Sequence, residues 1–194
     1  LVLRDIAQFP VLVQAAMQPE TNLLDAADFL ENSMVLGRSF QLSLVDFVGQ
    51  TLHRTKAEPL FDYTDHKAIQ SVLAGEIDHS ITIGKQHGEY YWTLAVPVLV
   101  RGFPEGALIA EAPFTSLLHL EAGLDNLEQQ YIEFAIGDSV ITSFGNKSAL
   151  EGAMAEEGVV YPLGTTGVDL RFYLDRGPIL AEQHSFITNI VLVF

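Results

Sequence analysis

The sequence contains no cysteine, few basic residues and no long apolar run, and each absence excludes a class of protein. Without cysteine there is no disulfide framework, no Cys-ligated zinc, no iron–sulfur cluster and no thiol catalysis. Only 10 Lys and Arg stand against 25 Asp and Glu, giving a formal net charge of −15. This balance argues against nucleic acid or anionic lipid head groups as binding partners. No apolar stretch reaches the roughly 20 residues that a membrane-spanning helix needs.

The residues that are present favour a folded domain. Hydrophobic residues make up 48% of the 194 positions. A chain of this length and composition buries enough apolar surface to offset its conformational entropy. We therefore expect one large or two small domains with a packed core.

The hydrophobic pattern predicts an α+β protein. Residues 1–37 have helical spacing with a break at 18–20, and Pro10 either kinks the first helix or lies near its start. Strands are expected at 40–46, 50–55, 79–83, 89–100, 106–112, 131–136, 140–144, 159–163 and 168–174. Helices are expected at 65–73, 114–130 and 148–157, and from Pro178 onward.

A faint internal repeat suggests two related units. The segments 41–52 and 131–141 are each a strand, an Asp-containing tight turn and a second strand. Segments 95–110 and 159–172 also resemble one another, at a shorter spacing from their first hairpin. The repeat predicts a complete unit followed by an abridged one. Because antiparallel hairpins share this pattern, chance similarity is the alternative.

The closing strands of the first unit carry a family resemblance. The aromatic, Pro-containing segment 88–98, followed by Gly102 and the Gly-started segment 106–109, resembles the CACHE family of extracytoplasmic PAS-like sensors. The resemblance implies a long N-terminal helix followed by two PAS-like antiparallel-sheet units, the second smaller. The implied domains are a helical stalk at 1–37, a membrane-distal unit at 38–114, and a linker helix, membrane-proximal unit and closing helix at 115–194.

The resemblance also implies a function. Members of this family sit outside the cytoplasmic membrane and feed histidine kinases, chemoreceptors or GGDEF/EAL enzymes. We therefore expect the extracytoplasmic sensory domain of a two-pass, homodimeric membrane signalling protein that detects a small ligand or a partner. The alternatives are a dimerisation or docking module without a small ligand, and a cytosolic PAS-like regulatory domain. The apolar segment 186–194 fits a chain approaching a membrane, a terminal strand or a core helix.

The aromatic strand holds the candidate ligand-binding residues. Alternation along a strand places Tyr90 and Trp92 on one face and Tyr91 and Thr93 on the other. Aromatic side chains with polar tips suit ligand pockets, although core packing explains them equally. Amino-acid-binding CACHE members carry an Arg shortly before these aromatics, and this chain does not. The candidate ligand-binding residues are Lys85, His87, Tyr90, Tyr91, Trp92 and Arg101.

No catalytic, metal or cofactor site is expected. The sequence contains no Gly-x-Ser-x-Gly elbow, phosphate loop or dinucleotide fingerprint, so the domain itself is not expected to be an enzyme. The six histidines form no i, i+4 pair. Asp62, Asp65 and His66 are close enough in sequence to suggest a metal, but Asp65 has an alternative use as a helix cap.

Overall fold

The N-terminal segment forms three helices. The computed structural model describes residues 2–35, 40–55, 63–86, 88–116, 130–145, 147, 159–164 and 166–174. Helices α1 (Val2–Ala7), α2 (Pro10–Met17) and α3 (Pro19–Glu31) replace the single long helix that the CACHE resemblance implies. Pro10 and Pro19 each lie in the first turn of a helix, where the missing N–H costs nothing. The prolines therefore begin new helices.

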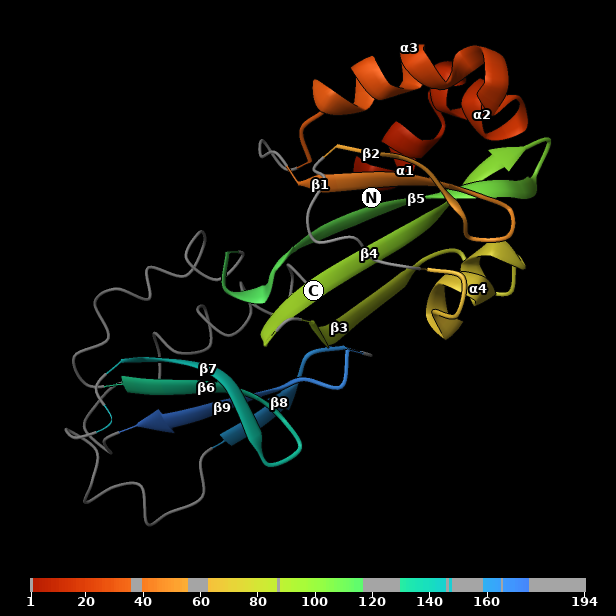
Figure 1. Cartoon of the computed structure of the whole chain (residues 1–194). Coiled ribbons are helices and arrows are strands. Elements are labelled where there is room, and N and C mark those ends of the chain that lie inside the picture. The colour runs from red at the N-terminus through yellow and green to blue at the C-terminus, as the bar shows by residue number, and fades with distance from the viewer. Residues whose placement is uncertain are drawn as a thin grey trace. The chain divides into compact units, whose positions relative to one another are not determined.

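A five-stranded sheet follows the helices. Its strands are β1 (Gln41–Asp46), β2 (Thr51–Arg54), β3 (Ser80–Gln86), β4 (Glu89–Val100) and β5 (Phe103–Pro113), and α4 (Lys67–Leu73) lies between β2 and β3 in the chain. The strand order is β2-β1-β5-β4-β3 (Figure 1). Two strands, a helix and three strands is the PAS-like order of elements that the sequence predicts.

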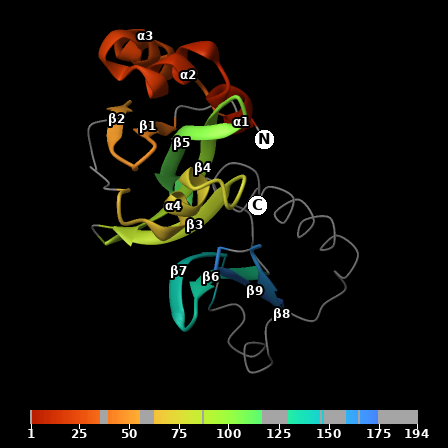
Figure 2. The same ribbon diagram turned by 90° about the vertical axis from the view of Figure 1, so that its right-hand side faces the viewer.

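The two faces of this sheet have different neighbours. A Cβ built on Gly106 would overlap the carbonyl oxygen of Val45 and lie 3.4 Å from the Cβ of Ala16 in α2. One face therefore lies against the N-terminal helices, and glycine at position 106 permits the close approach. Figure 2 shows α2 and α3 on one side of β1 and β5, apart from α4. Strand alternation turns Ala107, Ile109 and Glu111 to the opposite face.

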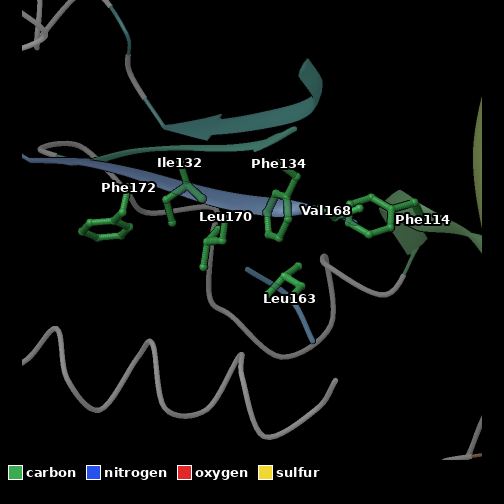
Figure 3. Close-up of a cluster of buried hydrophobic side chains, with 7 residues drawn as sticks. All are labelled: Phe114, Ile132, Phe134, Leu163, Val168, Leu170 and Phe172. Carbon is green, nitrogen blue, oxygen red and sulfur yellow. The ribbon is translucent and has the colours of Figure 1, made fainter. Parts of the chain in front are cut away.

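The second sheet has a core of its own. Strands β6 (Gln130–Ile136), β7 (Ser139–Gly145), β8 (Val159–Pro162) and β9 (Asp169–Leu174) are ordered β7-β6-β9-β8. Both hairpins predicted from the sequence are present, and β6 pairs with β9. Seven buried apolar residues form the core, shown in Figure 3: Phe114, Ile132, Phe134, Leu163, Val168, Leu170 and Phe172. The predicted α+β class with two antiparallel sheets is confirmed.

The chain divides into two compact units. The first comprises Leu1–Thr82 and Trp92–Ala112, and the second comprises Ile83–Tyr91 and Pro113–Phe194. The tip of the β3–β4 hairpin thus groups with the second sheet, where Ile83 and Tyr90 pack on its core. The predicted boundaries at 37/38 and 114/115, and the smaller size of the second unit, remain predictions. Most of the predicted helix at 114–130, and the helices at 148–157 and after Pro178, lie outside the described residues.

Candidate functional site

A cluster of buried polar side chains lies on the face of the first sheet opposite the N-terminal helices. Its members come from four strands and from the segment before α4. They are Ser43 of β1, Arg54 of β2, Tyr63, Thr93 of β4 and Glu111 of β5. Polar groups enclosed by a core are costly unless they are hydrogen-bonded, so such a cluster requires close geometry.

The Glu111 carboxylate is the centre of this cluster. Its Oε2 accepts hydrogen bonds from Arg54 Nη2 at 2.6 Å and from Tyr63 Oη at 2.7 Å. Its Oε1 lies 3.5 Å from the Thr93 hydroxyl, which donates to it. The side chains of Arg54 and Glu111 are only 6% and 1% exposed. The ion pair is therefore almost fully removed from solvent.

Tyr63 links the ion pair to the first strand. Arg54 Nη2 donates to Tyr63 Oη at 2.8 Å, and the Ser43 and Tyr63 hydroxyls are 3.2 Å apart. The guanidinium carbon of Arg54 also lies 5.6 Å from the centroid of the Tyr63 ring. Tyr63 thus fixes the guanidinium both through its hydroxyl and through its ring.

Strand register explains why these residues meet. Ser43 of β1 is paired with Arg54 of β2 on one side and with Ile109 of β5 on the other. Residues two apart on a strand share a face, so Glu111 lies on the same face as Ile109 and Ser43. Three adjacent strands therefore place a hydroxyl, a guanidinium and a carboxylate together.

Burial shifts the ionisation of the cluster. It raises the pKa of the Glu111 carboxyl, and the opposing effects of the Tyr63 hydrogen bond and the Arg54 charge are smaller. Burial, followed by the neighbouring Glu111 charge, raises the pKa of the Tyr63 hydroxyl. Tyr63 is therefore a neutral donor at physiological pH. The cluster offers donors, acceptors and one charge of each sign, the groups that a small polar ligand needs for orientation.

The predicted aromatic residues are divided by the alternation of β4. Thr93 is part of the cluster, whereas Trp92 lies on the other face, with its ring centroid 6.0 Å from that of Phe40. Within the described part of the chain, the buried Trp92 Nε1 has no hydrogen-bond partner. Tyr91 is half-buried, and its hydroxyl donates to Glu89 at 3.4 Å.

The other predicted site residues do not converge. Tyr90 packs on the core of the second unit, and Lys85 Nζ lies 5.4 Å from the centroid of its ring. Arg101 is exposed in the turn at the opposite end of β4 from Tyr90. His87 lies outside the described residues. The structure therefore brings Lys85 and Tyr90 together and leaves Arg101 apart from them.

Sequence reasoning missed Ser43, Arg54, Tyr63 and Glu111 as site residues. The usable signal was polarity inside apolar strands, because Glu111 interrupts the run Ala107–Ala112, which is otherwise apolar. A charged residue is almost never fully buried unless it is paired, so such an interruption predicts a partner. Tyr63 and Arg54 meet Glu111 only through the fold, and their local sequence gives no comparable signal.

The described residues show neither a metal cluster nor a membrane-spanning helix. Within the described ranges, no group of three or more His, Asp or Glu side chains is arranged to hold a metal ion. Asp62, one of three residues considered for a metal, lies outside those ranges. None of the helices in the described segments has the length and apolarity needed to cross a bilayer.

Comparison with known proteins identifies the fold. Neither a family model nor a curated protein sequence matches the chain. Among solved structures, the sensor domain of the Vibrio cholerae histidine kinase DctB is 12% identical, with a TM-score of 0.65 over 91% of this chain and 88% of its own.

Two further structures show the same likeness. The ligand-binding domain of the Pseudomonas aeruginosa amino acid chemoreceptor PctC, in complex with GABA, is 16% identical, with a TM-score of 0.56 over 89% of this chain and 87% of its own. A domain of a sensory box/GGDEF family protein from Vibrio parahaemolyticus is 13% identical, with a TM-score of 0.53 over 90% and 86%. The chain has the fold of these sensor domains, which confirms the CACHE-type resemblance at the level of the fold.

Proposed function

We propose that the chain is the extracytoplasmic sensory domain of a homodimeric, two-pass membrane signalling protein. A small ligand would bind on the face of the first sheet that carries the Glu111 cluster. The observation that carries this proposal is the concentration of buried hydrogen-bonding groups on that face. The fold supports it, because similar solved structures are sensor domains of a histidine kinase and of chemoreceptors.

Binding would act by shifting a conformational equilibrium. A ligand changes the state of a receptor only if it binds one conformation more tightly than the other. The Glu111 cluster joins four strands and the segment before α4, so a ligand that exchanges hydrogen bonds with it would alter their relative stability. The output would be relayed to a cytoplasmic kinase, chemoreceptor or cyclic-dinucleotide module on the same protein.

The second candidate is a dimerisation or docking module without a small ligand. One observation favours it: Glu111 already neutralises Arg54, so the cluster is balanced in charge without a ligand. A polar network that satisfies itself also stabilises a unique core.

Ligand screening separates the two candidates. The purified chain is screened against small metabolites by thermal unfolding. A ligand at 100 times its Kd adds about 2.7 kcal/mol to the free energy of unfolding, which for this size raises Tm by about 5–10 °C. Thr93→Val, which removes one hydroxyl from the cluster, should weaken binding by about 2- to 10-fold. Thr51→Val, at an exposed position of β2, is the matched control.

Two results would contradict a ligand at this face. The first is that no compound raises Tm, which favours the docking module. The second is a shift that is equal in Thr93→Val and Thr51→Val, which moves the binding site elsewhere.

A further inference from the structure

Five large apolar side chains are exposed at one end of the first unit. Phe103 is 71% exposed and Phe47 is 63% exposed, and the others are between 40% and 52% exposed. We call this set the apical surface: Met17, Phe47, Val48, Ile77 and Phe103. Single exposed apolar residues are normal on proteins, whereas a group of them marks an interaction surface.

Contacts between neighbouring segments place these residues at the same end of the sheet. Asp46, next to Phe47, is paired with Gly106 near the start of β5. A Cβ on Gly106 would lie 3.4 Å from the Cβ of Ala16, which precedes Met17. A Cβ on Gly75 would lie 3.4 Å from the side chain of Pro104. Gly75 is two residues before Ile77 and Pro104 directly follows Phe103, so the segments that carry these two apolar residues are neighbours. In Figure 1, the β1–β2 turn, the β4–β5 turn and α4 lie toward the same end of the sheet.

Hydrogen bonds within the β1–β2 turn hold it in shape. The Asp46 carboxylate accepts hydrogen bonds from the backbone N–H groups of Val48 at 3.0 Å and Gln50 at 2.8 Å. These bonds form an Asx-type turn that keeps Phe47 and Val48 outside the core. Phe47 and Val48 are thus presented by a fixed backbone, which lowers the entropy cost of binding.

The β4–β5 turn is strained. Arg101 has a φ of 53° and Gly102 a φ of 89°, so two consecutive residues are left-handed. Gly, Asn and Asp are the usual residues at such positions, because Gly has no Cβ to crowd the backbone and the short polar side chains of Asn and Asp form local hydrogen bonds. Strained backbone is concentrated at functional sites. Here the strained turn places an exposed cation immediately before Gly102 and Phe103.

The charges around the apical surface are mainly negative. Asp46, Glu76, Asp78 and Glu105 lie within two residues of its apolar members. The nearby cations are Arg101 and Arg4, and Arg4 is paired with Asp78 at 2.7 Å. An acidic rim repels a second copy of itself and an anionic bilayer surface, and attracts a basic one. Charge complementarity therefore favours a partner with a basic surface.

We propose that the apical surface docks a separate protein whose own contact patch has an apolar centre and a rim of Lys and Arg. Phe103 and Phe47 are the anchors, because large exposed aromatic side chains supply most of the energy in such contacts. The acidic rim would speed association and make it sensitive to salt. This input is independent of any small ligand at the Glu111 cluster.

Photo-crosslinking in cells that make the full protein is the first step of the test. A benzophenone amino acid replaces Phe103, and in the control it replaces Leu24 of α3, which is 85% exposed and outside the apical surface. A protein linked at position 103 and not at position 24 is identified and purified. The second step is titration of that protein with the wild-type chain, Phe103→Ser and Leu24→Ser, at low and high salt.

We expect Phe103→Ser to raise the Kd for the purified partner at least tenfold and Leu24→Ser to leave it unchanged. High salt should weaken the binding of the wild-type chain. The proposal is overturned if no product forms preferentially at position 103, or if the product is a second copy of the chain. It is equally overturned if the purified partner binds Phe103→Ser as tightly as wild type. Co-sedimentation with anionic vesicles that is lost in Phe103→Ser would assign this surface to a membrane instead.

Discussion

The guanidinium of Arg54 and the carboxylate of Glu111 form an ion pair with an N–O distance of 2.6 Å inside the first unit. The two residues are 57 positions apart in the sequence and lie on β2 and β5, which are separated by β1. Each neutralises a charge that would otherwise be buried alone. The pair therefore constrains three neighbouring strands.

Removing one member of the pair should be more damaging than removing both. Arg54→Met retains much of the apolar stem but leaves Glu111 buried without its cation, so we expect the free energy of unfolding to fall by about 3–5 kcal/mol at pH 7. The double variant Arg54→Met/Glu111→Met should lose less, because no uncompensated charge remains. Urea denaturation of the two variants and the wild type measures both losses. A double variant that is less stable than Arg54→Met would contradict the argument.

The raised pKa of Glu111 predicts a pH dependence of stability. Between the ordinary glutamate pKa of 4.5 and the higher folded value, the folded state binds more protons than the unfolded state. Stability attributable to Glu111 therefore rises as pH falls through this window, and is lost again as pH rises. Glu111→Gln has no such proton to bind. We expect the free energy of unfolding of the wild type to increase relative to that of Glu111→Gln as pH is lowered from 7 toward 4.5. A constant difference across that range would show that Glu111 has an ordinary pKa.

Much of the fold was predictable from the sequence because turns and periodicity are local. The strands around Asp46-Phe47-Val48-Gly49 and Gly137-Asp138 were located by their turn residues. The division of residues 1–37 was only partly foreseen, because Pro19 marked a break while Pro10 allowed two interpretations. The cluster of Arg54, Tyr63 and Glu111 depends on β1 lying between β2 and β5, and strand order is a long-range property that local pattern does not contain.

The core of the second unit depends on Phe134. Its ring lies between those of Phe114 at 5.4 Å and Phe144 at 6.3 Å, both edge-to-face. Phe134→Ala removes both ring contacts and leaves a cavity, so we expect a loss of about 3–5 kcal/mol in the free energy of unfolding. Val160→Ala, at an exposed position of β8, should change it by less than about 0.5 kcal/mol. Thermal or urea unfolding compares the two. Equal effects would mean that the seven-residue cluster is not the core of this unit.

Gly106 in β5 and Gly84 in β3 are both strand glycines, but only Gly106 is closely packed. A side chain on Gly106 would overlap the Val45 carbonyl, whereas one on Gly84 in β3 would meet nothing within 4 Å. Gly106→Ala should therefore lower the free energy of unfolding by about 1–3 kcal/mol through overpacking. Gly84→Ala should raise it by about 0.4–1 kcal/mol, because it restricts only the unfolded chain. Circular dichroism melts of both variants give the comparison. A well-tolerated Gly106→Ala would show that β1 and β5 are not held as closely as described.

Arg101 has a left-handed backbone conformation, which is less favourable for arginine than for asparagine or glycine. Asn at this position adopts the same backbone angles with less strain, so Arg101→Asn should raise the free energy of unfolding by about 0.5–1 kcal/mol. Arg101→Ala serves as the control, because it removes the charge but keeps a Cβ in the strained conformation. We expect no comparable gain from it. If Arg101→Asn is neutral or destabilising, the turn is not under strain, and the arginine then requires no functional explanation. If it is stabilising, the natural residue is kept at a cost in stability.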